Sequence, residues 1–415
     1  MLRWRSFVVQ KAGLVSSAMS NRILFVDDEP MVLKGLERSL RSMRAEWEMQ
    51  FVPGGAEALD AMTKKPFDVV ISDMRMPGMD GAQLLEQVRS RFSQTVRMVL
   101  SGQSDKDEVF RSIRPTHQYL SKPCDVEELK DKLKSALALR DVLESAELKQ
   151  RVSQIENVPS IPASYEKLRA QLESAHPDAQ EVAEIVSCDP GMTAKLLQLV
   201  NSAFLGTASR LSCPRQAASI IGLENLRTLV GGGLFCELPE GLTALLTPVW
   251  SHSYRTARLA KTVAQCENLG ELMVQNCYAA GLLHEIGWIV LASSYGGQFE
   301  QMCSQLNIQL TRPKREAAVF GARHGLVGSY LLGLWGLPDC IAEGAAGHHF
   351  PVEVNPTEFC PLVAVHVANT FDQQWHGSPE FIQDDAIDEN LLTKLGLRDR
   401  LPVWEQQCRL VDGAQ

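Results

Sequence analysis

The chain has 415 residues, of which 45% are hydrophobic and 22% charged, an ordinary globular composition with room for two or three domains. Its formal net charge of −9 argues against a broad nucleic-acid footprint or an anionic membrane surface as the main partner. The sequence contains no run of about 18 uninterrupted apolar residues, so we expect no membrane span.

Ten cysteines are scattered without a C-x-x-C pair, which favours free thiols in a reducing cytoplasm. The first 20 residues are faintly basic, but Gln10 and Lys11 interrupt their apolar run and no clean cleavage site follows. We therefore interpret residues 1–20 as a disordered extension. The sequence leaves open whether the true start is Met1 or Met19.

Residues 21–138 alternate short apolar runs with segments of helical length. The runs are RILFV, WEMQFV, FDVVI, TVRMVL and HQYL. Alternating units of this kind predict a doubly wound, five-stranded parallel sheet of the α/β class, flavodoxin-like, with helices on both faces.

The last helix of this region starts near Asp125, and no proline or glycine follows up to about Gln150. We therefore expect one long helix, with residues 139–154 as a helical linker that can transmit a shift rigidly. Four leucines recur at near-helical spacing and predict one buried stripe. They are Leu129, Leu133, Leu137 and Leu143.

Beyond residue 154 the strand pattern disappears. Residues 155–370 are typical of successive amphipathic helices, separated by glycine and proline, and predict an all-α domain. Residues 371–415 form an acidic, mixed tail in which we find no chemistry.

The stretch DVVISDMRMPGMDG, residues 68–81, ends an apolar run on a charge, Asp73. In a doubly wound sheet the reactive site forms at the carboxyl ends of the strands. Other polar residues fall at such ends: Asp27, Asp28, Ser101 and Lys122. Three close carboxylates repel one another unless a hard cation such as Mg²⁺ lies between them. The lysine and the serine can then contact a second anion, most simply a phosphoryl group on Asp73.

With these motifs, residues 22 to about 137 resemble the receiver domain of bacterial two-component response regulators. The resemblance implies that Asp27 and Asp28 are the acidic metal-binding pair and that Asp73 is the phosphoacceptor and a further Mg²⁺ ligand. It also implies that Arg75 offers its backbone carbonyl to the metal.

The same resemblance implies a switch around the phosphoryl group. Ser101 matches the switch hydroxyl, and Lys122, in SKP, matches the phosphate-contacting lysine. Tyr119 stands where the family carries its rotating aromatic. The implied partner is a sensor histidine kinase.

Five histidines and a glutamate are spread over the helical region. They are His252, His284, Glu285, His324, His348 and His349. Imidazoles and a carboxylate that converge can bind a divalent metal, and a metal-bound water can attack a phosphodiester. The alternative left open is that these imidazoles are retained packing residues.

The stretches around these residues, together with CDPGMTAKLLQLVNSAFLG and QAASIIGLENLRTLV upstream, resemble the HDOD domain. That family is related to the HD phosphohydrolases and to the HD-GYP cyclic-di-GMP phosphodiesterases. The chain departs from the active hydrolases at three positions. Glu285 replaces an aspartate, Trp288 replaces a lysine and Asn369 replaces the terminal aspartate. Because two acidic ligands are changed, we expect no multi-metal hydrolysis.

These observations favour a cytoplasmic response regulator, phosphorylated on Asp73, with a non-catalytic HDOD domain. We expect that domain to relay the signal by binding an unknown downstream protein, and the sequence leaves open whether the chain forms a homodimer. The negative net charge and the lack of a terminal helix-turn-helix signal disfavour DNA binding. The alternative hypothesis is a receiver-controlled, metal-dependent phosphohydrolase or cyclic-di-GMP phosphodiesterase.

Overall fold

The computed structural model places most of the chain in two domains. The described residues are 21–102, 115–122, 124–139, 142–201, 211–233, 235, 238, 240–304, 312–377 and 386–413. Within these ranges no helix combines the length and the apolar character needed to cross a membrane. The cysteines within them are free thiols.

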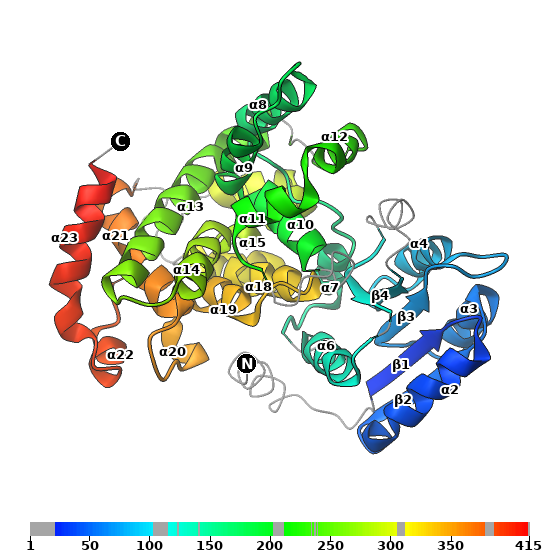
Figure 1. Cartoon of the computed structure of the whole chain (residues 1–415). Helices are drawn as coiled ribbons and strands as arrows, with labels where there is room; N and C mark the ends of the chain where they lie inside the picture. The colour runs from blue at the N-terminus through cyan, green and yellow to red at the C-terminus, as the bar shows by residue number, and fades with distance from the viewer. Residues whose placement is uncertain are drawn as a thin grey trace.

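The N-terminal domain is built on a five-stranded parallel sheet (Figure 1). Its strands are β1 (Asn21–Val26), β2 (Trp47–Val52), β3 (Val69–Asp73), β4 (Val96–Ser101) and β5 (Gln118–Ser121). The strand order is β2-β1-β3-β4-β5, and every neighbouring pair is parallel. The order reverses at β1, so the prediction of a doubly wound sheet is confirmed.

Helices cover both faces of this sheet. They are α2 (Pro30–Ser39), α3 (Gly55–Lys64), α4 (Gly81–Arg91) and α6 (Val126–Leu139), with a short 3₁₀ helix at Arg41–Met43. Successive strand residues point to opposite faces. Thus Ile23 and Phe25 pack in the core that contains α6, whereas Leu24 and Val26 pack in the core that contains α3 and α4.

The expectation of one long helix after Asp125 is wrong. Helix α6 ends at Leu139, residues 142–145 are not helical, and α7 (Ala146–Ser153) begins afterwards. The side chain of Ser145 caps α7 by accepting a hydrogen bond from the Leu148 backbone N–H at 3.2 Å, which favours a new helix start there. The leucine stripe is nevertheless buried, at Leu129, Leu133, Leu137 and Leu143.

The regular elements of the second domain are helices, and none of its described residues forms a strand. Its first helices are α8 (Pro162–Glu173), α9 (Ala179–Ser187), α10 (Pro190–Val200), α11 (Pro214–Ile221), α12 (Leu223–Gly231), α13 (Glu240–Cys266) and α14 (Glu271–Leu283). The next are α15 (Ile286–Tyr295), α16 (Gly297–Ser304), α17 (Arg312–Phe320), α18 (His324–Leu334), α19 (Asp339–Gly347), α20 (Pro351–Val354) and α21 (Pro361–His376). The all-α prediction is therefore confirmed.

The C-terminal segment packs back on the helical domain. Residue 370 lies inside α21, and α22 (Glu389–Lys394), the 3₁₀ turn Arg398–Arg400 and α23 (Leu401–Asp412) follow. Helix α23 runs beside α13 (Figure 1). Trp404 is fully buried there, and its indole N–H donates to Glu267 Oε1 at 2.7 Å. The expected tail thus contributes to the core.

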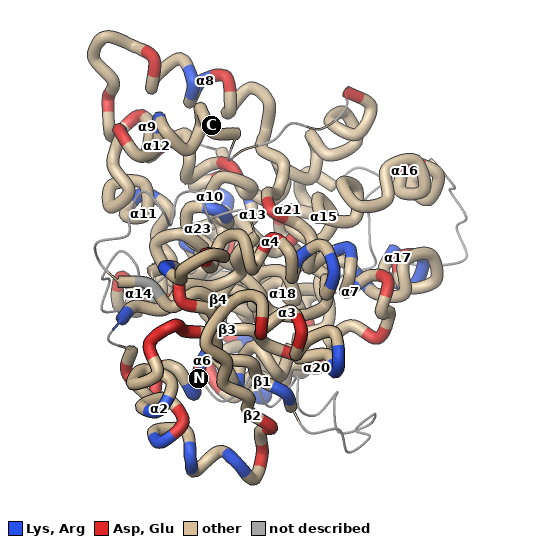
Figure 2. Tube along the Cα trace, turned by 90° about the vertical axis from the view of Figure 1, so that its right-hand side faces the viewer, with Lys and Arg blue, Asp and Glu red and all other residues tan. Residues whose placement is uncertain are grey.

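One hydrophobic cluster joins the two domains. It runs from one face of the sheet through α6 and α7 to the helices of the second domain, where α18 packs on both α6 and α7. Figure 2 shows acidic and basic residues interspersed over the described parts of both domains.

Candidate functional site

The first candidate site lies at the carboxyl ends of β1 and β3. Carboxylate oxygens of Asp27, Asp28 and Asp73 lie within 4.8 Å of one another, and Asp27 and Asp73 are buried. The ammonium of Lys122 lies 2.7 Å from Asp27 Oδ2 and 2.5 Å from Asp73 Oδ1. The structure thus brings together four of the residues predicted from the strand ends.

Burial and charge act in opposite directions in this carboxylate pocket. Burial raises the pKa of Asp73 above its ordinary value, and the hydrogen bond and charge of Lys122 only partly offset the rise. Burial lowers the pKa of Lys122, but Asp27 and Asp73 outweigh it and leave that pKa raised. The lysine therefore stays charged and acts as the internal counter-ion of the pocket.

The loop after β3 fixes the orientation of Asp73. The backbone N–H of Arg75 donates to Asp73 Oδ2 at 3.2 Å, while the Arg75 side chain is exposed. Gly78 adopts φ +79°, a conformation that favours glycine. A Cβ at Gly81 would collide with the Asp73 carbonyl oxygen. The proline-glycine turn is thus needed to bring α4 close to the end of β3.

The two predicted switch residues lie on neighbouring strands. Ser101 ends β4 and pairs with Ser121 of β5, but its side chain lies outside the described residues. Tyr119 is 1% exposed and packs in the core that contains α3 and α4. Its ring is therefore inside the domain in this conformation.

The second candidate site is a cluster of imidazoles inside the helical domain. His252 comes from α13, His284 follows α14, His324 starts α18, and His348 and His349 follow α19. The cluster consists of two overlapping groups, and within each group the potential ligand atoms lie within 4.8 Å of one another. One group is Glu285, His324, His348 and His349, and the other is His252, His284 and Glu285. All six residues predicted for this site thus converge. We call them the histidine cluster.

The Nδ1 atoms of four rings in the cluster are fixed by neighbours outside it. His284 Nδ1 lies 2.7 Å from the Gly281 carbonyl oxygen, and His348 Nδ1 lies 2.8 Å from that of Ala345. A carbonyl oxygen can only accept, so both Nδ1 atoms carry hydrogen. Two carboxylates accept from the other rings in the same way, Asp372 from His252 at 2.6 Å and Glu316 from His324 at 2.7 Å.

The Nε2 atoms of the same rings face one another. His252 Nε2 lies 3.1 Å from His284 Nε2, and His324 Nε2 lies 3.1 Å from His348 Nε2. His349 Nε2 lies 3.2 Å from His324 Nε2. Burial, together with the neighbouring rings, lowers the pKa of His284 to about 3 and that of His348 well below its usual value. These neutral rings therefore direct lone pairs at their partners.

Glu285 provides the carboxylate of the cluster and is 1% exposed. Its Oε2 accepts from Arg312 at 3.2 Å, whereas its buried Oε1 has no hydrogen-bond partner. The Arg312 guanidinium lies 3.6 Å over the Trp288 ring, and the Trp288 indole N–H donates to Glu316 Oε1 at 2.7 Å. Burial raises the pKa of Glu285, but Arg312 and the ring of His324 outweigh it and hold that pKa well below its usual range.

Helix α21 supplies an amide and a carboxylate at the edge of the cluster. Asn369 Oδ1 lies 3.0 Å from His252 Nε2, so the neutral residue does stand beside the site. Asp372 is 1% exposed and is held by Arg255 at 2.5 Å and 3.0 Å. Its carboxylate contacts Nδ1 of His252 and so orients that ring, but it is not among the converging ligand atoms.

Family models match both halves of the chain. The response regulator receiver domain matches residues 23–134, and the HDOD domain matches residues 158–351. The chain is a receiver domain followed by an HDOD domain.

Solved structures similar to the chain include the receiver domain of an HD domain-containing protein from Pseudomonas fluorescens Pf-5. It is 30% identical, with a TM-score of 0.28, and the match covers 29% of this chain and 98% of that one. The MmoQ response regulator from Methylococcus capsulatus is 16% identical, with a TM-score of 0.45, over 60% of this chain and 98% of that one.

Curated relatives match parts of the chain. A Treponema pallidum protein is 26% identical over 217 residues, which is 51% of this chain and 41% of that protein. The NtrC transcriptional regulator of Klebsiella pneumoniae is 38% identical over 104 residues, 25% of this chain and 22% of that protein. The chain thus spans less than half the length of these relatives.

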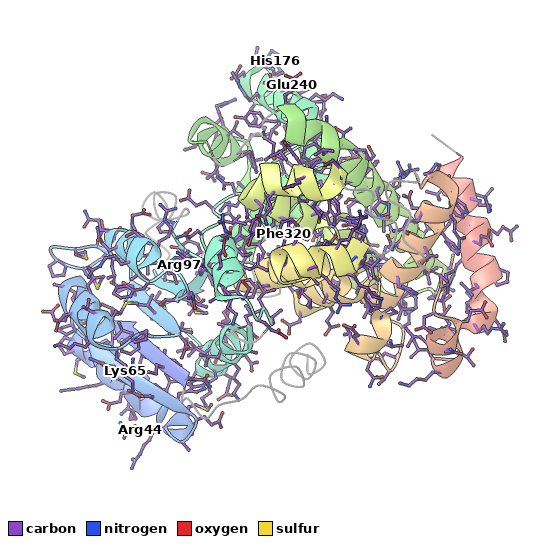
Figure 3. All side chains as sticks on the ribbon, turned by 180° about the vertical axis from the view of Figure 1, so that it is seen from behind. Arg44, Lys65, Arg97, His176, Glu240 and Phe320 are labelled. Atoms are coloured by element: carbon purple, nitrogen blue, oxygen red, sulfur yellow. The ribbon has the colours of Figure 1, made fainter. Side chains whose placement is uncertain are left out.

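The receiver domain contacts the segment that leads into the HDOD domain through a buried arginine, Arg97 of β4, which Figure 3 labels near the junction of the two domains. Its Nη2 lies 2.6 Å from His117 Nε2 and donates to the Ser153 carbonyl oxygen of α7 at 2.8 Å. Burial lowers the pKa of Arg97 to about 9. The guanidinium thus ties the receiver sheet to the segment that enters the HDOD domain.

Sequence reasoning missed the partners that orient the histidine cluster. Arg312 and Glu316 stand four residues apart, which would place them on one helical face, but nothing in the sequence links them to Glu285. Asp372 stands three residues after Asn369 and could have been found as its neighbour on the same face of a helix.

Proposed function

We propose that the chain is a response regulator whose receiver domain is phosphorylated on Asp73. The observation that carries this proposal is the bridge that Lys122 makes between Asp27 and Asp73 at the carboxyl edge of the sheet. It supplies a nucleophilic carboxylate with a cation beside it, which phosphoryl transfer requires. A receiver domain in general works with a sensor kinase and with Mg²⁺, and we propose both here.

In the proposed reaction a carboxylate oxygen of Asp73 attacks the phosphorus of a phosphohistidine on the kinase. The P–O bond forms as the P–N bond breaks, and the electron pair returns to the histidine nitrogen of the kinase. Lys122 then exchanges its contact with Asp73 for one with a phosphoryl oxygen. Mg²⁺, held by Asp27, Asp28, Asp73 and the Arg75 carbonyl, would neutralise charge on the phosphoryl group. Ser101 and Tyr119 would complete the switch.

We propose that the output is a protein–protein contact made by the HDOD domain. Of the two acidic positions changed from active hydrolases, Glu285 lies in the histidine cluster and Asn369 at its edge, and a guanidinium already neutralises Glu285. This supports a relay without catalysis. We further propose residues 21–138 as the receiver domain, 139–154 as the linker and 155–370 as the main part of the HDOD domain.

The test is incubation with a small acyl phosphate and Mg²⁺, followed by intact-mass measurement. Wild type should gain one phosphoryl group, and Asp73→Asn should gain none. Asp125→Asn is the matched control, because Asp125 caps α6 through its side chain and asparagine caps a helix equally well. Equal labelling of wild type and Asp73→Asn would exclude Asp73 as the acceptor.

The second candidate function is metal binding in the HDOD domain, which one observation favours. Pairs of Nε2 atoms face each other at 3.1 Å beside an unpartnered buried carboxylate oxygen of Glu285. A cation bound between such nitrogens would join them, and Nδ1–H groups held by outer acceptors are the usual support of metal-binding histidines. The nitrogen-rich donor set suits a transition metal such as Zn²⁺.

Metal content tests the second candidate. Wild type purified without chelator should contain a transition metal if the second candidate is right, and His324→Ala should lose it. His176→Ala is the control, because His176 is exposed and stands outside the cluster. Equal metal content in wild type and His324→Ala would remove this candidate.

A further inference from the structure

Strand β5 reaches from the carboxylate pocket to the HDOD domain. It is only four residues long, with Gln118 first, and Lys122 follows its last residue directly. Lys122 contacts Asp73, whereas Gln118 faces the helical domain. A strand this short has little room to absorb a shift at one end, because each residue spans only about 3.3 Å.

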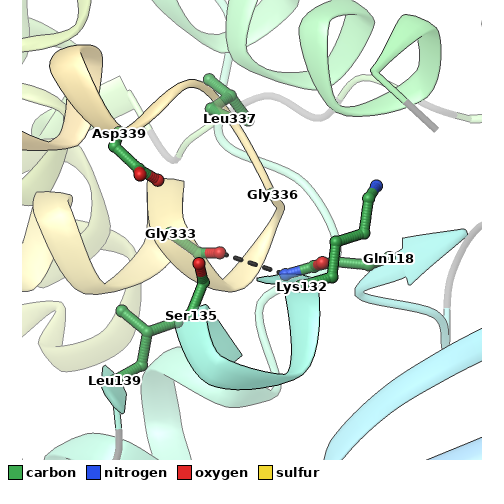
Figure 4. Close-up of a pocket in the computed structure, with 8 residues that line it drawn as sticks. All are labelled: Gln118, Lys132, Ser135, Leu139, Gly333, Gly336, Leu337 and Asp339. Atoms are coloured by element: carbon green, nitrogen blue, oxygen red, sulfur yellow. Dashed lines mark hydrogen bonds between the residues drawn. The ribbon is translucent and has the colours of Figure 1, made fainter. Parts of the chain in front are cut away.

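The side chain of Gln118 holds the C-terminal end of α18. Its amide nitrogen donates to the carbonyl oxygen of Gly333 at 3.2 Å (Figure 4). It also donates to that of Leu334 at 3.1 Å. These carbonyls belong to the last turn of α18, where that of Gly333 also accepts from the Gly336 backbone N–H at 3.0 Å. One receiver side chain thus caps an HDOD helix from outside.

The contact is closely packed. A Cβ at Gly333 would lie 2.7 Å from Leu139 Cδ2, and one at Gly336 would lie 3.0 Å from Gln118 Cδ. The space left between these residues is about 10 Å³, room for about one water molecule. Since the surfaces fit this closely, α18 cannot slide past β5 without breaking the two hydrogen bonds.

The other end of α18 lies in the histidine cluster. His324 is its first residue, so Gln118 and the cluster are separated by one helix of 11 residues, about 16 Å long. A Cβ at Gly287 would collide with the His324 carbonyl oxygen, so α18 also packs directly on α15. The helix is therefore held at both ends, by the receiver at one and by the cluster at the other.

We infer that β5 and α18 couple the phosphorylation state of Asp73 to the geometry of the histidine cluster through Gln118. The inference rests on the proposed phosphorylation of Asp73 and names the route by which the HDOD domain responds to it. When Lys122 turns toward a phosphoryl group, β5 shifts, the Gln118 contacts with Gly333 and Leu334 change, and α18 moves His324. By linkage, a ligand that fixes the cluster alters the affinity of the pocket for the phosphoryl group.

The structure offers a matched control on α10. Gln198 Nε2 donates across the same domain junction to the carbonyl oxygens of Thr116 at 3.4 Å and His117 at 3.1 Å. Like Gln118, it makes two amide hydrogen bonds between the domains. Helix α10, however, contributes no residue to the histidine cluster. Gln118→Ala and Gln198→Ala thus remove similar contacts, but only the first touches the route through α18.

The experiment is hydrogen exchange of the full chain with and without Mg²⁺ and beryllofluoride, a phosphoryl analogue. In wild type, protection should change around Asp73 and also in α18 and residues 284–292, by about 5- to 150-fold, the range of typical couplings. Gln118→Ala should keep the response around Asp73 and lose the response in α18. Gln198→Ala should keep both. Gly333→Ala, which presses on Leu139 and leaves Gln118 intact, should also lose the response in α18.

Three outcomes would contradict the inference. The route is wrong if Gln118→Ala responds in α18 as wild type does. It is also wrong if Gln198→Ala loses the α18 response to the same extent, because the junction as a whole then carries the signal. If residues around Asp73 fail to respond in wild type, the proposed phosphorylation itself fails, and the coupling with it.

Discussion

The carboxylate pocket and the histidine cluster differ in how their charges are balanced. In the pocket a single lysine, Lys122, contacts two carboxylates and keeps 26% of its side chain exposed, so it can turn to a new partner. Beside the histidine cluster, Arg312 is 7% exposed, pairs with Glu285 and Glu316 and stacks on the Trp288 ring. The carboxylate pocket thus has a movable counter-ion suited to a switch, whereas the histidine cluster has a fixed one suited to a scaffold.

Removal of the fixed counter-ion should have the largest effect. Arg312→Gln leaves Glu285 buried without its cation, and we expect a loss of about 3–5 kcal/mol in the free energy of unfolding. The control is Arg323→Gln, since Arg323 is paired with Glu353 near the surface and its loss should cost less than about 1 kcal/mol. Urea denaturation of both variants measures the difference. Equal costs would show that Arg312 does not balance a buried charge.

Acid should destabilise the metal-free histidine cluster. The pKa of His284 falls from 6.5 to about 3 on folding because burial disfavours the charged ring. The unfolded chain therefore binds the extra proton between pH 6.5 and 3, and stability falls as the pH drops through this window. One such group costs up to about 1.4 kcal/mol per pH unit, or roughly 2–3 kcal/mol at pH 4.5.

Urea midpoints of chelator-treated protein at several pH values test this expectation. His284→Gln should flatten the profile, while His176→Gln should leave it unchanged, since His176 is exposed. If the urea midpoint of His284→Gln falls with pH as steeply as that of wild type, the acid sensitivity arises from other groups.

Removal of the movable counter-ion should have a smaller effect on stability. Lys122→Met leaves Asp27 and Asp73 facing each other, and we expect a loss of about 1–3 kcal/mol at neutral pH. Mg²⁺ should restore much of the loss, because it neutralises the same carboxylates. The pKa of Asp73, already raised by burial, should rise further once the lysine no longer opposes it. Acyl-phosphate labelling of the variant should therefore decline at a higher pH than in wild type.

The carboxylate pocket could be predicted from the sequence because its geometry follows from strand order. Asp27, Asp73 and Lys122 each stand at the carboxyl end of a strand, and parallel strands bring those ends to one edge. The long linker helix was predicted wrongly because the absence of proline and glycine does not reveal a new helix start, here capped by Ser145.

The histidine cluster was harder to predict. Its residues lie on helices far apart in the chain, and only the resemblance to a known family grouped them. The fixed tautomers depend on backbone carbonyls such as that of Gly281, and the pairing of Glu285 depends on Arg312, 27 residues away. The Gly281 contact is local, three residues back along the chain, whereas the Arg312 contact does not follow from helical periodicity. Tertiary packing decides the pairing of Glu285, and it also decides whether the cluster is a metal site or a scaffold.

The central claim is that phosphoryl chemistry occurs in the carboxylate pocket and that the histidine cluster relays without hydrolysis. The most direct test treats one sample of the full chain with a small acyl phosphate, Mg²⁺ and a transition metal, and measures both phosphoryl occupancy by intact mass and cyclic-di-GMP turnover. We expect one phosphoryl group on wild type, none on Asp73→Asn, and no turnover above that of His324→Ala. Turnover that requires both Asp73 and His324 would instead establish the chain as a phosphorylation-controlled phosphodiesterase.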